Sequence, residues 1–268
     1  MKLSALTRIS LRSVALGYLL ILLVLPLAII LWRTFEHGIG TFIDWISTPA
    51  AISAFNLSMI ILAIVVPVNV VFGILTALAL VRGRFPGRNL LQGLVDLPFA
   101  VSPVVVGVSL ILLWGAGGWF GGLEDHGLKV IFNLPGMVLA TIFVTLPFVV
   151  REVEPVLHEI GDDQEQAAAT LGASRWQTFW RITLPAIRWG LTYGVVLTVA
   201  RSLGEFGAVI MVSTALPGKS QTLTLLVHGR YEDHNTFGAY AAATLLMGIA
   251  LIVLLLMTLL ERKRGTAK

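Results

Sequence analysis

The 268-residue chain contains no cysteine and only five histidines. Without a thiol it can form neither a disulfide nor a thiol-ligated metal centre. The histidines are scattered along the sequence without the regular spacing of metal ligands, so we expect no metal site. The sequence therefore offers no candidate for metal-dependent or thiol-dependent catalysis.

Charged residues are also scarce. They make up 13% of the chain, against about 25% in soluble proteins, while 56% of the residues are hydrophobic. The mean hydropathy is +0.87. This composition predicts an all-α integral membrane protein with six apolar runs, each long enough to cross a bilayer as a helix of roughly 20 residues. The runs cover 13–31, 54–81, 90–114, 130–150, 187–213 and 237–260.

Basic residues are distributed unevenly between the segments that separate these runs. Fourteen of the 19 lysines and arginines fall in the two ends and in alternate connections, when Arg188 at the very start of the fifth run is counted with the connection before it. Four fall in the opposite connections, and Arg201 lies well inside a run. Because cytoplasmic segments are enriched in basic residues, this pattern places both termini in the cytoplasm and the segments 34–53, 115–127 and 214–236 outside. The predicted parts are a cytoplasmic N-terminal segment (1–12), a six-helix domain (13–260) and a cytoplasmic tail (261–268).

The first run also admits a signal peptide. The apolar region of such a peptide covers about 7–15 residues and ends at a cleavage site with small residues. The run from 13 to 31 is longer, and five more apolar runs follow. We therefore expect an uncleaved first helix.

The longest polar interval, residues 162–185, predicts two short helices with a tight corner. Asp162 or its neighbour is placed to cap the first helix, where the helix dipole favours acids. Gly172 falls where the chain must turn, at a position that often needs a positive φ. Ser174 and Gln177 have the spacing of a capping box for the second helix. The pattern alone is also compatible with an ordinary polar loop that carries two surface helices.

The same interval resembles the cytoplasmic signature of ABC importer permeases, which reads Glu-Ala-Ala, three residues, Gly, nine residues, Ile, one residue, Leu-Pro. Gln166 stands where the family usually has glutamate and Glu165 is beside it, so which of the two makes the family's contact is left open. The resemblance implies a coupling segment that docks on a separate ATPase subunit, and we expect Ala173 and Trp176 to take part. The residues on signature positions are Ala167, Ala168, Gly172, Ile182, Leu184 and Pro185.

Three charged residues fall inside apolar runs, where charges are costly and usually face a cavity or a partner. They are Asp96 in the third run and Arg201 and Glu205 in the fifth. Arg201 and Glu205 are four residues apart, so we expect them on one helix face and within reach of each other. They are compatible with a purely structural pair or with a pathway in which the arginine attracts an anion. With Ser102 in the third run, these are the candidate pathway and gate residues.

The sequence offers no nucleotide site. Gly218-Lys219-Ser220 resembles the end of a phosphate-binding loop, but Ser213 occupies the position of the required glycine. We therefore expect a non-catalytic subunit that holds no cofactor, with ATP and Mg²⁺ bound by the partner ATPase.

Three further stretches resemble sulfate/thiosulfate ABC permeases of the CysW type. They are residues 191–209, 96–107 and 221–225, and the likeness covers most of 54–260. It implies a type I ABC importer permease fold in the cytoplasmic (inner) membrane. It also implies a related but different second permease, two ATPase subunits and an extracytoplasmic sulfate-binding protein that meets the outer segments. No nucleic-acid partner is expected.

Two other transport functions stay open at this point. A permease for molybdate or tungstate would carry oxyanions of similar charge and shape. An ion-coupled secondary transporter would show inverted internal repeats with broken helices in matching halves, and the sequence shows no such repeat.

Overall fold

The computed structural model describes residues 5–265, so Lys2 and Lys268 of the two predicted cytoplasmic ends lie outside the described residues. Within this range every regular element is a helix, as predicted. Five helical segments are long and apolar enough to span a membrane, and a bent pair raises the number to six if it is counted as one span. The five segments cover Ser10–Phe35, Pro49–Arg82, Leu134–Ile160, Arg175–Leu203 and Thr236–Leu256.

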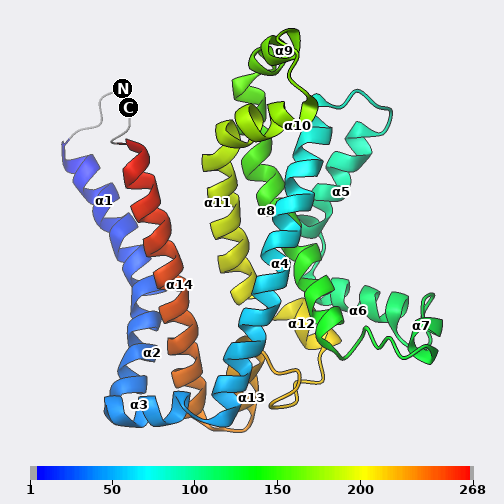
Figure 1. Ribbon diagram of the computed structural model, residues 1–268. Helices are drawn as coiled ribbons and strands as arrows, with labels where there is room; N and C mark the ends of the chain where they lie inside the picture. The colour runs from blue at the N-terminus through cyan, green and yellow to red at the C-terminus, as the bar shows by residue number, and fades with distance from the viewer. Residues whose placement is uncertain (1–4, 266–268) are drawn as a thin grey trace.

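The first and last spans run side by side, apart from the centre of the molecule (Figure 1). They consist of α1 (Ala5–Leu19), the π-helical turn η1 (Leu20–Val24) and α2 (Leu25–Phe35) on one side and α14 (Thr236–Gly265) on the other. Between residues 10 and 33 no side chain is buried. The buried Thr34 hydroxyl lies 2.8 Å from that of Thr244 and joins α2 to α14.

Three long helices form the central bundle. They are α4 (Pro49–Arg82), α8 (Leu134–Ile160) and α11 (Leu184–Leu203). α11 lies against α8 through small residues, because a Cβ on Gly190 would stand 2.6 Å from the carbonyl oxygen of Glu152. Small residues such as this glycine let two helices approach closely. The core beside this contact contains Leu80, Val150, Leu157 and Ile187.

The third predicted span is broken, and the expectation of one helix across 90–114 is wrong. α5 (Arg88–Ala100) and α6 (Pro103–Trp114) meet at 113°. Val101 and Ser102 between them have extended backbone, with ψ of 133° and 134°. Proline has no N–H and disfavours helical geometry in the residue before it, so Pro103 ends one helix and starts the next.

The fifth predicted run is broken as well. α11 ends at Leu203, and the short α12 (Gly207–Val212) begins after a non-helical stretch from Gly204 to Phe206. Glu205 lies in this break, so the expectation that it shares a helix face with Arg201 is wrong. The packing of α12 against α6 is close, because a Cβ on Gly107 would stand 2.6 Å from Met211 Cβ.

The predicted outer segments contain helices rather than plain loops. They are α3 (Ile39–Ile46), α7 (Gly122–Asp125) and α13 (Leu223–Glu232). The start of α13 is buried, and the Leu223 N–H donates to Ser58 Oγ of α4 at 3.0 Å. The stretch 220–226 is therefore part of the core rather than an exposed loop.

Different elements lie at the two ends of the molecule (Figure 1). The predicted coupling segment, with α9 (Asp163–Thr170) and α10 (Arg175–Thr178), lies at one end together with the start of α1 and the end of α14. The helices α3 and α13 lie at the opposite end. The two termini therefore share a side with the coupling segment, and which side of the membrane this is stays a prediction.

Candidate functional site

The coupling segment folds as two short helices with a corner, and most of its predicted local geometry is confirmed. Gly172 has φ of +82° at the turn. Ser174 Oγ accepts from the Gln177 N–H at 3.3 Å, and Gln177 Oε1 accepts from the Ser174 N–H at 2.9 Å, which completes the capping box. Asp162 occupies the N-cap of α9, but its side chain makes no capping hydrogen bond, so that detail of the prediction is wrong.

Glu165 anchors the coupling segment to the bundle. Its Oε2 accepts from Arg82 Nε at the end of α4 at 3.1 Å, and its Oε1 accepts from the Thr183 hydroxyl at 2.8 Å. Thr183 ends the π-helical turn η2 (Phe179–Thr183), which leads directly into α11. Arg82 also donates to the carbonyl oxygens of Leu157 and Gly161, near the end of α8. One carboxylate therefore joins α9 to α4 and to the start of α11.

Glu165, rather than the exposed Gln166, makes the contacts within this chain. Ala167 is exposed, Ala168 is buried and Ala173 is half-buried. Of the last three signature residues, Ile182 lies in η2 and is half-buried, while Leu184 and Pro185 begin α11 and are half-buried and exposed, respectively. These residues shape the segment and its junction with α11, and their contact with an ATPase stays a prediction.

An exposed apolar surface, here called the aromatic tip, consists of Leu171, Trp176 and Trp180. Leu171 is 88% exposed and Trp176 is 69% exposed. The rings of Trp176 and Trp180 meet edge to face with centroids 5.5 Å apart. Sequence reasoning identified Trp176 but not Leu171, because a leucine at the end of a helix is usually buried. Such a surface is suited to contact with another protein.

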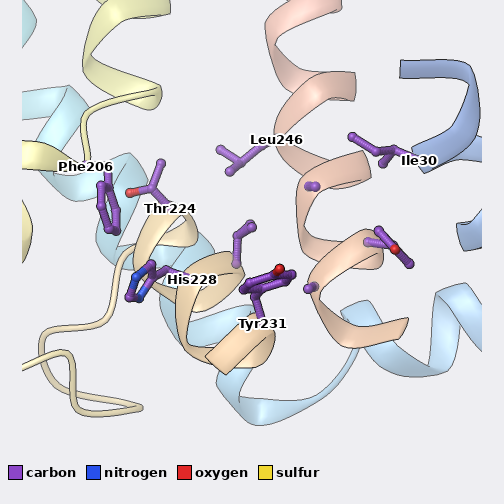
Figure 2. Close-up of a pocket in the computed structure, with 10 residues that line it drawn as sticks. Ile30, Phe206, Thr224, His228, Tyr231 and Leu246 are labelled. Atoms are coloured by element: carbon purple, nitrogen blue, oxygen red, sulfur yellow. The ribbon is translucent and has the colours of Figure 1, made fainter. Parts of the chain in front are cut away.

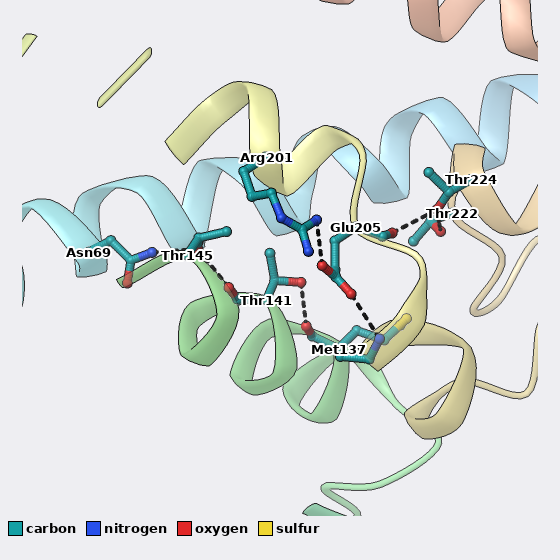
Figure 3. A network of polar contacts seen from close by, with 9 residues as sticks. Asn69, Met137, Thr141, Thr145, Arg201, Glu205, Thr222 and Thr224 are labelled. Atoms are coloured by element: carbon teal, nitrogen blue, oxygen red, sulfur yellow. Dashed lines mark hydrogen bonds and ion pairs between the residues drawn. The ribbon is translucent and has the colours of Figure 1, made fainter. Parts of the chain in front are cut away.

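The second candidate region surrounds Glu205 (Figure 3). Its Oε2 lies 2.7 Å from Arg201 Nη1, and its Oε1 accepts from the Ala208 N–H at 2.8 Å. The Glu205 carbonyl oxygen accepts from the Thr224 hydroxyl at 2.8 Å. The predicted ion pair is confirmed, and it joins α11, α12 and α13 across the break. The Glu205 side chain is 1% exposed and that of Arg201 is 33% exposed.

Asp96 lies apart from this pair. It accepts from Arg151 Nη2 of α8 at 2.6 Å, and both side chains are partly exposed. The Arg151 guanidinium carbon also stands 5.5 Å from the centre of the Phe99 ring. Because Asp96 and Arg151 are 55 residues apart, no spacing rule indicated this pairing. The four candidate pathway residues are therefore not one cluster.

Two of the four candidate pathway residues line one cavity of about 460 Å³. It lies at the bend between α5 and α6, and Ser102 and Arg201 both line it. Phe99 and Phe148, whose ring centroids are 5.5 Å apart, belong to its wall. Its other lining residues are Pro98, Ala100, Val101, Pro103 and Val144. The walls thus combine one cation with apolar side chains and a stretch of extended backbone.

A buried polar ladder joins α4 to α8 beside this region (Figure 3). Asn69 Nδ2 donates to Thr145 Oγ1 at 2.7 Å, and the Thr145 hydroxyl donates to the Thr141 carbonyl at 2.6 Å. The Thr141 hydroxyl donates in turn to the Met137 carbonyl at 2.8 Å. The partner of Asn69 is 76 residues away, so no short-range spacing indicated this contact.

A second cavity, of about 550 Å³, lies between α2, α13 and α14 (Figure 2). Its walls are mostly apolar and contain no lysine or arginine. They include Ile30, Phe206, Thr224, His228, Tyr231 and Leu246. This cavity is suited to hydrophobic contact and not to an anion. Among the side chains that the structure describes, no group of three or more could hold a metal ion.

Comparison with known proteins gives consistent matches. The family model described as "Binding-protein-dependent transport system inner membrane component" matches residues 69–266. The chain is 48% identical over 258 residues to the sulfate transport system permease protein CysW of Synechococcus elongatus, covering 96% of this chain and 90% of that protein. It is 38% identical over 246 residues to the sulfate transport system permease protein CysT of Synechocystis, covering 91% and 86%.

A solved structure shares the fold. It is a bacterial alginate ABC transporter in complex with an alginate pentasaccharide-bound periplasmic protein. One of its chains matches with a TM-score of 0.79 and 19% identity, covering 96% of this chain and 94% of that chain. At this identity the match concerns the fold alone, and it confirms the predicted importer permease fold.

Proposed function

The chain belongs to the family of binding-protein-dependent transport system inner membrane components, and we propose that it is the membrane-spanning permease subunit of an ATP-driven importer for sulfate and thiosulfate. It is a multi-pass protein of the inner membrane. The substrate assignment rests on the 48% identity to a sulfate permease over 96% of the chain. In this proposal the subunit is non-catalytic, and ATP and Mg²⁺ are bound by a separate ATPase.

The proposed assembly contains a second, different permease. Its support is the chain's lower but still extensive similarity to CysT, a second kind of sulfate permease. The family description names a binding protein, and the alginate transporter was solved with a periplasmic one. We therefore propose a sulfate-binding protein on the outer side and two ATPase subunits on the cytoplasmic side.

The contacts of the coupling segment support a mechanical role. A push on the aromatic tip would act on α9, whose Glu165 contacts both the end of α4 and the turn before α11. The far end of α11 contains Arg201, so displacement of α9 would be transmitted along a rigid helix to the interior. An alternating-access cycle needs two packed arrangements of the helices, and a partner that favours one of them over the other. Here the helices would be α9 and α11, and the partner would be the ATPase.

Uptake of radiolabelled sulfate tests the proposal. Cells that lack sulfate import would receive this chain with its partner permease, ATPase and binding protein, with and without excess molybdate. We expect uptake that depends on this chain and withstands molybdate. Loss of uptake to molybdate would shift the substrate to that oxyanion, and no uptake from a fully assembled complex would contradict the importer function.

A further inference from the structure

We propose that the cavity at the bend between α5 and α6 is a transient binding site for a divalent oxyanion, with the Arg201 guanidinium as its cationic group. The inference rests on the proposed function, because it assumes that an anion passes through this chain. The cavity measures about 460 Å³. That is the volume of about 15 water molecules in the liquid, so a small oxyanion fits together with part of its hydration shell.

Arg201 retains most of its hydrogen-bonding capacity for a ligand. A guanidinium has five N–H donors in a planar fork that matches the edge of an oxyanion. Only Nη1 is engaged, by Glu205 Oε2 at 2.7 Å. In the part of the chain that the structure describes, Arg201 has no other ion-pair or hydrogen-bond partner. The side chain lines the cavity, and its 33% exposure leaves the other donors accessible.

Glu205 makes the site weak enough to release its ligand. Its carboxylate is buried and is held in place by the Ala208 N–H at 2.8 Å, so it does not swing into the cavity. The pair with Arg201 is close to neutral. An anion therefore meets a directional donor set without a large excess of positive charge. A transport site needs this balance, because its ligand must leave as readily as it enters.

The bend between α5 and α6 contributes one further polar residue to the cavity. Ser102, in the extended stretch between the two helices, is exposed and lines the cavity together with Arg201. It adds a hydroxyl to the site that Arg201 defines.

Phe99 and Phe148 form the wall of the cavity on the side of the coupling segment. Along α8 the order toward its α9 end is Val144, Phe148, Arg151. Val144 and Phe148 line the cavity, and Arg151 lies about one turn further, with its guanidinium carbon 5.5 Å from the centre of the Phe99 ring. An anion that leaves Arg201 in that direction must pass the two rings before it reaches Arg151.

A single introduced thiol tests the site. The chain has no cysteine, so Ser102→Cys places one thiol at the cavity when the partner subunits are cysteine-free. In membranes that contain the assembled transporter, the thiol is modified with an anionic methanethiosulfonate (sulfonatoethyl) and with a cationic one (trimethylammonioethyl). The ratio of the two rates reports the local potential. The measurement is repeated with sulfate, thiosulfate or molybdate against chloride at equal ionic strength.

Arg201→Gln in the Ser102→Cys background is expected to lower the anionic-to-cationic rate ratio about tenfold, since a focused positive potential raises local anion concentration by at least that factor. Arg201→Lys keeps the preference. Arg33→Gln, which removes the same charge from an exposed pair with Glu36, leaves the ratio unchanged. A ratio that Arg201→Gln does not change overturns the site.

Protection of the Ser102→Cys thiol by oxyanions tests the site even if the Arg201 variants fail to assemble. We expect a tetrahedral oxyanion to slow modification of Ser102→Cys by both reagents. Absence of protection by all three oxyanions overturns the site, whether or not sulfate uptake is measured. Protection by molybdate but not by sulfate supports the site and contradicts the proposed substrate, so the two failures are distinguishable.

Discussion

Two glutamates close to the two ends of α11 make similar contacts in different surroundings. Glu165, near its start, divides its oxygens between Arg82 and the Thr183 hydroxyl. Glu205, just beyond its end, divides its oxygens between Arg201 and a backbone N–H of α12. Each one joins separate helices, so each fixes one end of α11.

The difference between them is burial. The Glu165 side chain is 22% exposed and that of Glu205 is 1% exposed. Water can replace part of what Glu165 provides, but it has little access to the buried Glu205 carboxylate itself. An unsatisfied buried polar group costs far more free energy than an exposed one. We therefore expect the buried Glu205 to stabilise the fold and the partly exposed Glu165 to transmit movement from the coupling segment.

Glu205→Ala gives the largest expected effect. It leaves the Ala208 N–H and part of Arg201 without a partner inside the protein. Breaking a buried pair costs about 3–5 kcal/mol, and the partial exposure of Arg201 puts this case near the lower value. We expect a lowered thermal midpoint of the purified complex and a still larger loss of sulfate uptake. Uptake that falls only in proportion to the amount of protein would assign the pair a purely structural role.

Glu165→Ala is expected to destabilise the protein less, by about 2 kcal/mol, because two hydrogen bonds to a charged group are lost where water can enter. Uptake should fall while the permease pair still assembles. The matched control is Gln166→Ala, which removes the exposed neighbour and should leave uptake unchanged. A reversed result, with Gln166 essential and Glu165 dispensable, would contradict the anchor role. Sulfate uptake and thermal midpoint of both variants measure the difference.

Gly172→Val separates coupling from stability at the coupling-segment end of α11. A valine at φ of +82° costs about 1–2 kcal/mol, and the corner between α9 and α10 should no longer form. We expect normal insertion into the membrane and no sulfate uptake. Gly172→Asn serves as the control, since asparagine tolerates this backbone conformation, and it should retain most uptake. Normal uptake by Gly172→Val would remove the coupling assignment.

Trp176→Ala has the smallest expected effect on stability, within about 0.5 kcal/mol for an exposed residue. Its ring lies in the aromatic tip, beside the rings of Phe179 and Trp180. We expect an unchanged thermal midpoint of the isolated permease pair and reduced copurification of the ATPase. Trp119→Ala, at an 89% exposed position far from the tip, should change neither quantity. Equal ATPase binding by wild type and Trp176→Ala would exclude the tip as a docking surface.

Features that depend on neighbours within a few residues were predictable. The corner at Gly172 and the capping box of Ser174 follow from the preferences of single residues and from spacing over three positions. The pair of Arg201 and Glu205 also forms, although the helix between them ends at Leu203. Proline indicated helix breaks at Pro67, Pro98 and Pro103, but only at Pro103 does one of the three begin a new helix. Pro67 and Pro98 lie inside the continuous helices α4 and α5, so that part of the prediction is wrong.

The sequence by itself determined the membrane class, the apolar runs and the local form of the coupling segment, because composition and short-range spacing control these properties. Only the tertiary structure decided which distant groups meet. It paired Asp96 with Arg151, linked Asn69 to Thr145 and turned Glu165 toward α4. It also formed the cavity beside Arg201. Such contacts depend on how the helices pack and bend, and no spacing along the chain specifies that packing.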